Sequence, residues 1–521
     1  MTGECESRTQ VRLSPFIRAC RSLKLSVYCD VRIIGQRFAV LSSLMLLVFP
    51  LFISPDILHA QSSAERRNRE LDFSRRVSES RLRKSVIQLV RFGNRLGGTP
   101  SGDRSSDFVA QAFRVLGFQT ESVKDPLKPA FVHDGWKLRV DQPRRLRGLI
   151  QNDWLGGFSP SARERTARLT FVDVQEGWNA KDVAHAVVLL QGTIPDDRYA
   201  QLASDGALAI LEYEVVNSAA YSNWAMITNL PPSDRNPIPL FDISNLAGRR
   251  LRQELQKGTS VIIRFASKSH VRPGSPRTVV ATMRGATDSC YIVCAHGDSD
   301  SGGPGADDNA SGVAGVMEIA RVLHTMRSSS LPQPKRTIRF IVWGSEYFST
   351  EDYVRKHQAE LGKILGVLNF DEIGTGKSRN CIYFEGNDIP QNEALLRILN
   401  SIGEEYVGKP GFWKEATTNP SQGGTDSYVF LPDYLSRLHV PAETIPSVTI
   451  YTAAWNAPKK LAQTPGWASR AWHGQKDTVV VDYSLFYHSS LDLPQFTTEK
   501  EPFDMTWGVR AAGIALLRLA W

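Results

Sequence analysis

The sequence predicts an α/β chain with a three-layer α/β/α architecture, in which a mixed, mostly parallel sheet is covered by helices on both faces. Two observations lead to this class. From residue 278 onward, apolar runs of strand length alternate with helical stretches, as in 291–296, 311–326 and 337–344. The runs are almost continuously apolar, which is typical of strands whose two faces are both buried.

The N-terminal residues 1–60 are predicted to be a signal peptide. Arg32 and Arg37 precede an uncharged stretch at 38–55, and the small residue Ala60 precedes a plausible cleavage site. A retained anchor is the alternative, because this stretch approaches the length of a membrane span. We therefore expect a secreted or periplasmic protein, attached to a membrane only through 38–55 if the segment stays uncleaved.

Residues 61–145 are predicted to be the first part of the α/β domain. The charged segment 62–80 is expected to be a loose lead-in. Apolar residues then recur at helical spacing in 80–92 and in 105–118, and a break that contains Gly and Pro separates the two helices.

Residues 146–268 have a different pattern, in which short apolar runs alternate with polar turns. Their order resembles a protease-associated domain, a β-rich insert that is common in secreted peptidases. An unrelated α/β insert is the alternative. We expect this insert to interrupt the α/β domain, which resumes at residues 269–521.

The net charge argues against a nucleic-acid-binding protein, and the cysteines argue against a fold built on disulfides. The net charge of +8 is modest for 521 residues with 62 basic and 54 acidic side chains, so the sequence does not predict a nucleic-acid partner. Cys290 and Cys294 lie in one apolar run. Residues four apart in a strand are about 13 Å apart, too far for a disulfide, so both are predicted to be buried thiols.

Acidic and histidine side chains follow the predicted strands at their carboxyl ends, the edge at which open α/β sheets bind ligands. The residues concerned are His296, Asp298, Asp307, Asp308, Glu346, Asp371 and His488. A single Asp after a strand is usually a helix cap, but so many at one edge are hard to explain as caps. Imidazole and carboxylate are the ligands of zinc ions that keep a position open for water. The sequence therefore predicts a zinc hydrolase site.

The segments that carry these residues resemble the motif series of the M28 family of zinc aminopeptidases and carboxypeptidases. The segments are "AHGDSDSGGPGADDNASGVAGVMEIARVL", "IVWGSEYF", "LNFDEIG", "GGTDSYVF" and "YHSSLD". The resemblance covers residues 80–145 and 270–521 and implies the zinc-exopeptidase fold.

The resemblance also implies roles for individual residues. His296 and Asp371 would bind one zinc ion, and Asp308 would bridge it to a second ion bound by His488. Asp298 would orient His296 through a hydrogen bond. Glu346 would be the general base that deprotonates the attacking water and later protonates the leaving amine.

The chain departs from the family pattern at Tyr347. The family has a second glutamate there, which is a ligand of the second zinc ion, whereas a phenol that titrates near 10 is a poor ligand. Three interpretations stay open: a substitute ligand from His473, Glu351 or Glu372, an enzyme with one zinc ion, or a non-catalytic relative. His473 is also the alternative to His488 as the last histidine ligand.

The sequence thus predicts an exported zinc exopeptidase, most plausibly an aminopeptidase that acts on peptides. A carboxypeptidase of the same fold and a degenerate peptide-binding relative are the alternatives. Tyr347, Thr425 and Asp426 are candidates for lining the substrate cleft.

Overall fold

A computed structural model describes residues 55–215, 222–299, 302–374, 381–387, 389–414, 416–419, 425–441, 444–453, 468–469, 479–480 and 486–521. The chain divides into two compact units, Met1–Ala64 and Glu65–Trp521, and the second unit contains both sheets and every site residue discussed below. The predicted signal segment 38–55 lies almost entirely outside the described residues. Within those residues, no helix is long and apolar enough to cross a membrane.

The helices and strands of the larger α/β part flank a second group in the middle of the chain. The elements before that group are α2 (Pro55–Arg76), α3 (Glu79–Val90), α4 (Pro100–Val115) and β1 (Gln119–Lys124). Those after it are β9 (Arg277–Met283), β10 (Thr287–His296), η6 (Ala306–Ser311), α8 (Gly312–Ser329), β11 (Arg336–Trp343), α9 (Glu346–Lys356), η7 (Gln358–Lys363), β12 (Ile364–Phe370), β13 (Cys381–Glu385), η8 (Pro390–Asn392), α10 (Glu393–Tyr406), β14 (Ala416–Asn419), η9 (Asp426–Phe430), α11 (Pro432–Arg437), β15 (Ser447–Ala453), β16 (Ala468–Ser469), β17 (Val479–Val480) and α12 (Phe503–Ala520).

The larger sheet has eight strands in the order β1-β9-β11-β10-β12-β15-β13-β14. Its four central strands, β11, β10, β12 and β15, are mutually parallel, and β9 and β13 pair with them antiparallel. The mixed sheet with a parallel centre confirms the predicted fold class. The parallel centre brings the carboxyl ends of β10, β11 and β12 to one edge.

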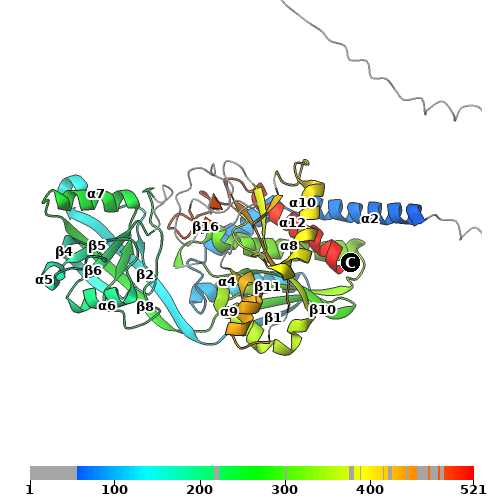
Figure 1. Cartoon of the computed structure of the whole chain (residues 1–521), viewed down its shortest axis with the longest axis horizontal. Coiled ribbons are helices and arrows are strands. Elements are labelled where there is room, and N and C mark those ends of the chain that lie inside the picture. The colour runs from blue at the N-terminus through cyan, green and yellow to red at the C-terminus, as the bar shows by residue number, and fades with distance from the viewer. Residues whose placement is uncertain are drawn as a thin grey trace, which may run out of the picture. The chain divides into compact units, whose positions relative to one another are not determined.

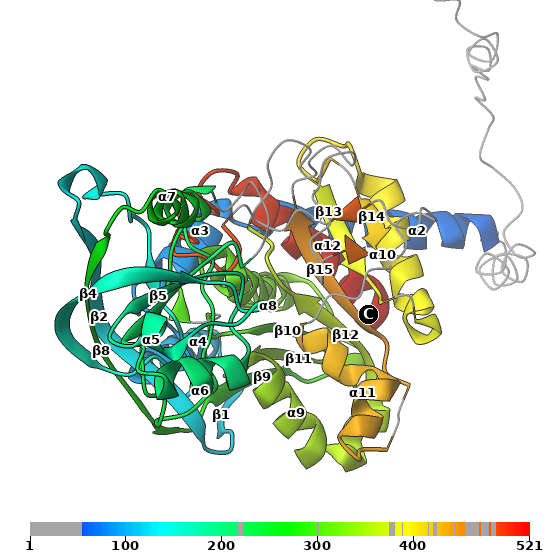
Figure 2. The ribbon, with the colours of Figure 1, turned by 60° about the vertical axis from the view of Figure 1, so that its left-hand side comes forward.

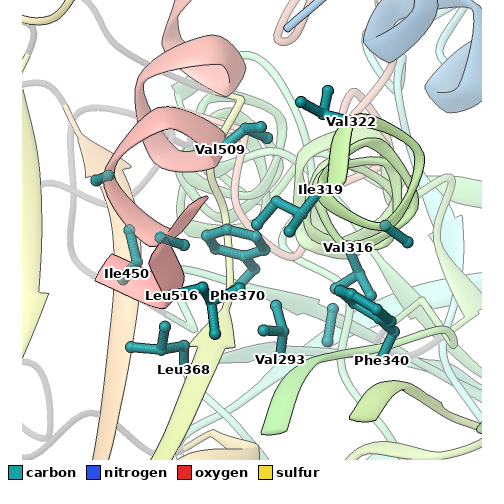
Figure 3. Close-up of a cluster of buried hydrophobic side chains, with 14 of the residues drawn as sticks. Val293, Val316, Ile319, Val322, Phe340, Leu368, Phe370, Ile450, Val509 and Leu516 are labelled. Carbon is teal, nitrogen blue, oxygen red and sulfur yellow. The ribbon is translucent and has the colours of Figure 1, made fainter. Parts of the chain in front are cut away.

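Helices cover both faces of this sheet because successive strand residues point to opposite sides. On one face, Val293 of β10 packs in a core with α8 and α12, where Ile319 and Leu516 are fully buried (Figure 3). On the other face, Cys290 and Cys294 pack in a core with α9 and α11. Both thiols are free and buried, as predicted. Figure 2 shows α8 and α9 with β10 and β11.

The second sheet has seven strands in the order β2-β8-β4-β5-β6-β7-β3. Figure 1 labels its strands β2, β4, β5, β6 and β8. Its elements are β2 (Lys128–Gln142), η3 (Arg144–Leu146), β3 (Trp154–Leu155), β4 (Ala162–Val172), α5 (Ala180–Val183), β5 (Val187–Gln191), α6 (Asp196–Ser204), β6 (Ala209–Tyr213), β7 (Leu240–Asp242), α7 (Asn245–Gln256) and β8 (Ile262–Gly274). The sheet therefore extends from Lys128 to Gly274, beyond the predicted range 146–268 at both ends. The long β2–β8 pair is the cause, because it leads out of and back into the larger sheet.

Two local predictions for the first helices need correction. The segment 62–80 is not a loose lead-in, since α2 runs through it as far as Arg76. Glu70 is fully buried there and accepts hydrogen bonds from Arg518 and the Tyr406 hydroxyl, so charge pairing holds this polar helix against the core. Helix α4 starts at Pro100 inside the predicted break, because Thr99 caps it by accepting the Gly102 N–H.

Candidate metal centre

Three neighbouring strands deliver polar side chains to one edge of the larger sheet. His296 is the last residue of β10, Asp371 follows β12, and Glu346 is the first residue of α9, three residues after the end of β11. Asp308 lies in the turn η6, directly before α8. This is the carboxyl edge at which the sequence predicted the site.

His296, Asp308 and Asp371 form the group in the described residues that could hold a metal ion, with one ligand atom of each within 4.8 Å of the others. His296 Nε2 lies 3.3 Å from Asp308 Oδ1 and 3.5 Å from Asp371 Oδ1. His296 and Asp308 are buried, and Asp371 is partly exposed.

The hydrogen bonds of His296 indicate that a cation belongs at this point. Its Nδ1 faces two acceptors, the Asp298 carbonyl oxygen at 3.1 Å and Asp298 Oδ1 at 3.2 Å, so Nδ1 carries the hydrogen. In the neutral ring, the Nε2 lone pair then points at two carboxylate oxygens, which repel it. Asp371 Oδ1 is buried without a hydrogen-bond partner among the described residues. A zinc ion between these three atoms fits the donor set.

The pKa of His296 reports the same need for positive charge. Burial alone would lower it, but Asp371, Asp298 and Asp308 outweigh burial and hold the pKa well above its usual range. The two histidines hold the pKa of Asp308 below its usual range despite its burial.

Asp308 connects two histidines through its two carboxylate oxygens. Oδ1 faces His296, and Oδ2 lies 2.9 Å from Nε2 of His488, whose side chain is 20% exposed. The geometry therefore places His488 where the sequence predicted the last ligand. The rival His473 lies outside the described residues.

Asp298 connects the histidine to the predicted base. Its Oδ1 accepts the Nδ1–H of His296 and also the backbone N–H of Glu346 at 3.0 Å. Burial raises the pKa of Glu346 well above its usual range; His296 opposes this shift, and Asp426 and Asp371 add to it. One carboxylate thus sets the ring of His296 and the start of α9.

Tyr347 is packed away from a ligand position. Its ring stacks on Tyr434 with the centroids 6.2 Å apart and an interplanar angle of 9°. It also packs against the core between the sheet and α9. Burial, followed by the charges of Glu346 and Asp426, raises the pKa of its phenol, so it stays neutral. A neutral, stacked phenol supplies no anionic ligand.

The other candidate ligands lie as follows. Glu351 accepts a hydrogen bond from the Tyr434 hydroxyl at 2.6 Å and pairs with Arg355, so it is engaged on α9. Glu372 is buried with Oε1 unpartnered among the described residues, and its pKa is raised well above its usual range by burial, then by Asp307 and Asp308. Glu372 is therefore next to the centre, whereas Glu351 is not directed to it.

Thr425 and Asp426 are both buried, although the sequence placed them in the lining of a cleft. The Thr425 hydroxyl accepts the Asn369 amide at 2.9 Å, and Asp426 Oδ1 accepts the Thr350 hydroxyl at 3.2 Å. Burial raises the pKa of Asp426 to about 8. These hydrogen bonds link Thr425 to β12, which leads to Asp371, and Asp426 to α9, which begins with Glu346.

Two residues of the site were not found from the sequence. Arg95 is buried and donates hydrogen bonds to the carbonyl oxygens of Gly297, Pro304 and Gly305. These bonds hold the loop between His296 and Asp308. Asp492 accepts the backbone N–H groups of Asp307 and Asp308. Asp492 lies in the quoted segment "YHSSLD", where its distance from His488 was a usable signal, whereas nothing around Arg95 marked it.

Comparison with protein families identifies the part of the chain that holds this centre. Residues 278–491 match the model of Peptidase family M28. The match includes the residues of the carboxyl edge from His296 to His488, and it excludes Arg95, Asp492 and the whole of the second sheet. It agrees with the motif resemblance.

Named relatives carry aminopeptidase designations. An aminopeptidase of Pseudomonas aeruginosa (strain UCBPP-PA14) is 26% identical over 355 residues, which cover 64% of this chain and 64% of that protein. A probable lipoprotein aminopeptidase, LpqL of Mycobacterium tuberculosis, is 26% identical over 54% of this chain and 55% of that protein. The chain thus matches somewhat less than two thirds of the length of these relatives.

Solved structures agree on the fold. A Peptidase M28 precursor from Shewanella amazonensis SB2B superposes with a TM-score of 0.61 at 18% identity, over 87% of this chain and 97% of that one. BSAP, a zinc aminopeptidase from Bacillus subtilis, superposes with a TM-score of 0.56 at 18% identity, over 85% and 96%. At this identity the likeness concerns the fold.

Proposed function

Because residues 278–491 form a domain of peptidase family M28, we propose that the chain is an exported, zinc-dependent aminopeptidase that removes N-terminal residues from peptides. The group His296, Asp308 and Asp371 at the carboxyl edge carries this proposal. The aminopeptidase designations of the relatives support it. Export rests on the signal-like residues 1–60.

The charge of the site favours the amino end of a peptide over the carboxyl end. Asp298 and Asp371 add negative charge around His296 and Asp308, and Glu372 Oε1 has no partner among the described residues. A peptide carboxylate would need a free Arg or Lys. The buried Arg95 gives its N–H groups to backbone carbonyls. An α-ammonium group is therefore the complementary end.

The residues offer two unequal positions for zinc. His296, Asp308 and Asp371 supply three ligands, which is the usual number for a catalytic zinc ion. A second ion would have His488 and the other oxygen of Asp308, with no carboxylate from Tyr347. We expect one tightly bound ion and a second, weaker one. When bound, zinc supplies Lewis acidity that polarises the peptide carbonyl and acidifies a water molecule.

The chain's own groups would perform the proton transfers. Glu346 takes one proton from the attacking water and gives it to the nitrogen of the departing amine, so the peptide C–N bond breaks with the charge balanced. Burial raises the pKa of Glu346, which favours the protonated form that donates to the departing amine. Asp298 holds the Glu346 backbone and the His296 ring in their relative positions.

The second sheet fits the expected protease-associated insert in its position and β-rich content, and we propose it as such. A degenerate peptide-binding protein is the second candidate, and Tyr347 is the observation that favours it. The two candidates differ in turnover and in their response to Glu346.

The test uses residues 61–521 and a mixed peptide pool, half of it N-acetylated, with products followed by mass spectrometry with and without added zinc. We expect stepwise loss of N-terminal residues from the unblocked peptides alone. Glu346→Gln should reduce turnover to background while it keeps the zinc content and melting temperature, because Glu346 is not a ligand. Activity equal to the wild type in this variant would refute the mechanism. Absence of cleavage by the wild type would favour the peptide-binding protein.

A further inference from the structure

We infer that the second sheet positions the metal centre, because its segment 224–228 holds the loop that carries His488. The inference rests on the proposed function, in which His488 serves the centre. It assigns Trp224 and Thr228 as positioning residues, which act through the loop and do not touch substrate.

Segment 224–228 contacts the loop at His488 and at residues on both sides of it. The Ile227 N–H donates to the His488 carbonyl oxygen at 2.7 Å, and Met226 pairs with Ser489 as an isolated antiparallel bridge. Two residues before Met226, the ring of Trp224 lies 4.7 Å from the ring of Phe486, tilted by 34°. The segment thus pairs with His488 and with the residues next to it.

Asn152, which precedes β3, also forms hydrogen bonds with both the segment and the loop. Its carbonyl oxygen accepts the Ala225 N–H at 3.1 Å and the Ser490 hydroxyl at 3.0 Å. Asn152 therefore joins the segment and the loop at the other side of His488. The backbone of His488 lies between these contacts.

The segment is itself fixed in the core of the second sheet by two buried acids. Thr228 donates its N–H to Asp242 at 3.0 Å and its hydroxyl to Asp242 at 2.7 Å, with Glu212 Oε2 at 3.1 Å. Glu212 is the last but one residue of β6, Asp242 is the last residue of the neighbouring strand β7, and they are 0% and 1% exposed. Burying two carboxylates is costly unless they bind specific partners. Here they bind the segment that reaches His488.

The backbone of His488 has a conformation that contacts from neighbouring residues must stabilise. Its φ of +46° lies in the left-handed region, which side chains other than glycine rarely adopt. Such a conformation persists where the surroundings determine it more strongly than the residue's own preference. The hydrogen bond from Ile227 and the Met226–Ser489 bridge provide that determination. The His488 ring then meets Asp308 Oδ2.

The second sheet also reaches the loop before Asp308. Burial lowers the pKa of the His133 ring of β2, and the Gly302 backbone lies close enough to that ring to offset part of the lowering. His133 is held edge-on by Trp136 and Trp154. The sheet therefore contacts both loops that converge on Asp308, the one from His296 and the one around His488.

The experiment compares Trp224→Ala with two matched variants. Trp224→Phe keeps an aromatic ring against Phe486. Trp178→Ala removes another tryptophan of the second sheet, whose indole N–H bonds Asp205 away from the loop. For each protein we would measure kcat, KM, zinc content, melting temperature, and hydrogen exchange of the amides in 486–492.

Trp224→Ala should lower kcat about 10-fold or more at nearly constant KM, since loss of a group that orients a ligand typically costs 10–100-fold. Trp224→Phe should restore most of it, and Trp178→Ala should keep wild-type kcat even if it melts earlier. Exchange in 486–492 should be faster in Trp224→Ala alone. Wild-type kcat and exchange in Trp224→Ala would overturn the inference. If the wild type itself proves inactive, the proposed function fails, and the exchange comparison still decides whether the segment holds the loop.

Discussion

The buried acid pair Glu212 and Asp242 should make the stability of the chain depend on pH. Burial, then the neighbouring Asp242, raises the pKa of Glu212 from 4.5 to about 8, and burial raises the pKa of Asp242 to about 7. A carboxyl group with a raised folded pKa binds its proton more tightly in the folded than in the unfolded state. The stability that the protonated Glu212 contributes is therefore lost as the pH rises from about 4.5 to about 8. Above about pH 8, this group no longer changes the stability with pH.

The substitution Glu212→Gln tests this reasoning because the amide imitates the protonated acid. In the wild type, Glu212 Oε1 accepts the Ile194 N–H at 2.7 Å. The amide oxygen of the variant can still accept this N–H, and its NH₂ group can donate towards Thr228. At about 1.4 kcal/mol for each unit of pKa, a rise of roughly three units corresponds to about 4 kcal/mol. The variant should have wild-type stability near pH 4.5 and exceed it by up to about 4 kcal/mol at pH 8.

Urea unfolding between pH 4.5 and 8.5 measures the difference directly, because the slope with urea separates stability from changes in the unfolded state. Glu176→Gln, which removes an exposed acid of the same sheet, is the control and should show no such pH dependence. A difference between Glu212→Gln and wild type that is the same at every pH would refute the assignment of a raised pKa to the buried Glu212.

Two further predictions concern the metal centre. Tyr347→Glu should tighten binding of a second zinc ion, seen as a second equivalent in calorimetry; an unchanged stoichiometry would mean that another residue already completes that site. Asp298→Asn should weaken zinc binding about 10–100-fold in a chelator competition, because Asp298 fixes the tautomer of His296. Wild-type affinity in that variant would contradict the role of Asp298.

The larger sheet and its edge were predictable because their signals are local. Runs such as 337–344 are apolar over the length of a strand, and a polar residue after each run marks the carboxyl end. His296, Glu346 and Asp371 could therefore be placed from the sequence. Asp308 and His488 needed the motif resemblance, since neither directly follows a strand.

The rest depended on partners distant in the sequence. Helix α2 looks like a charged linker until Glu70 meets Arg518, 448 residues later. Arg95 is one arginine among many until it bonds Gly297, Pro304 and Gly305. The left-handed φ of His488 arises from contacts with 224–228. No periodicity in the sequence records such contacts.

The way the second sheet is attached to the first bears on how the chain folds. β1 and β9 are adjacent antiparallel strands, with Lys124 opposite Arg277, so in an unfolded chain their pairing must close a loop of residues 125–276. Once β2 and β8 have paired, Lys128 lies opposite Gly274, and only short stretches separate the two ends. By the logarithmic dependence on loop length, this lowers the closure cost by about 3 kcal/mol. The middle of the chain should therefore fold before the edge of the larger sheet forms, and its β2–β8 arm turns a very distant strand pair into a local hairpin.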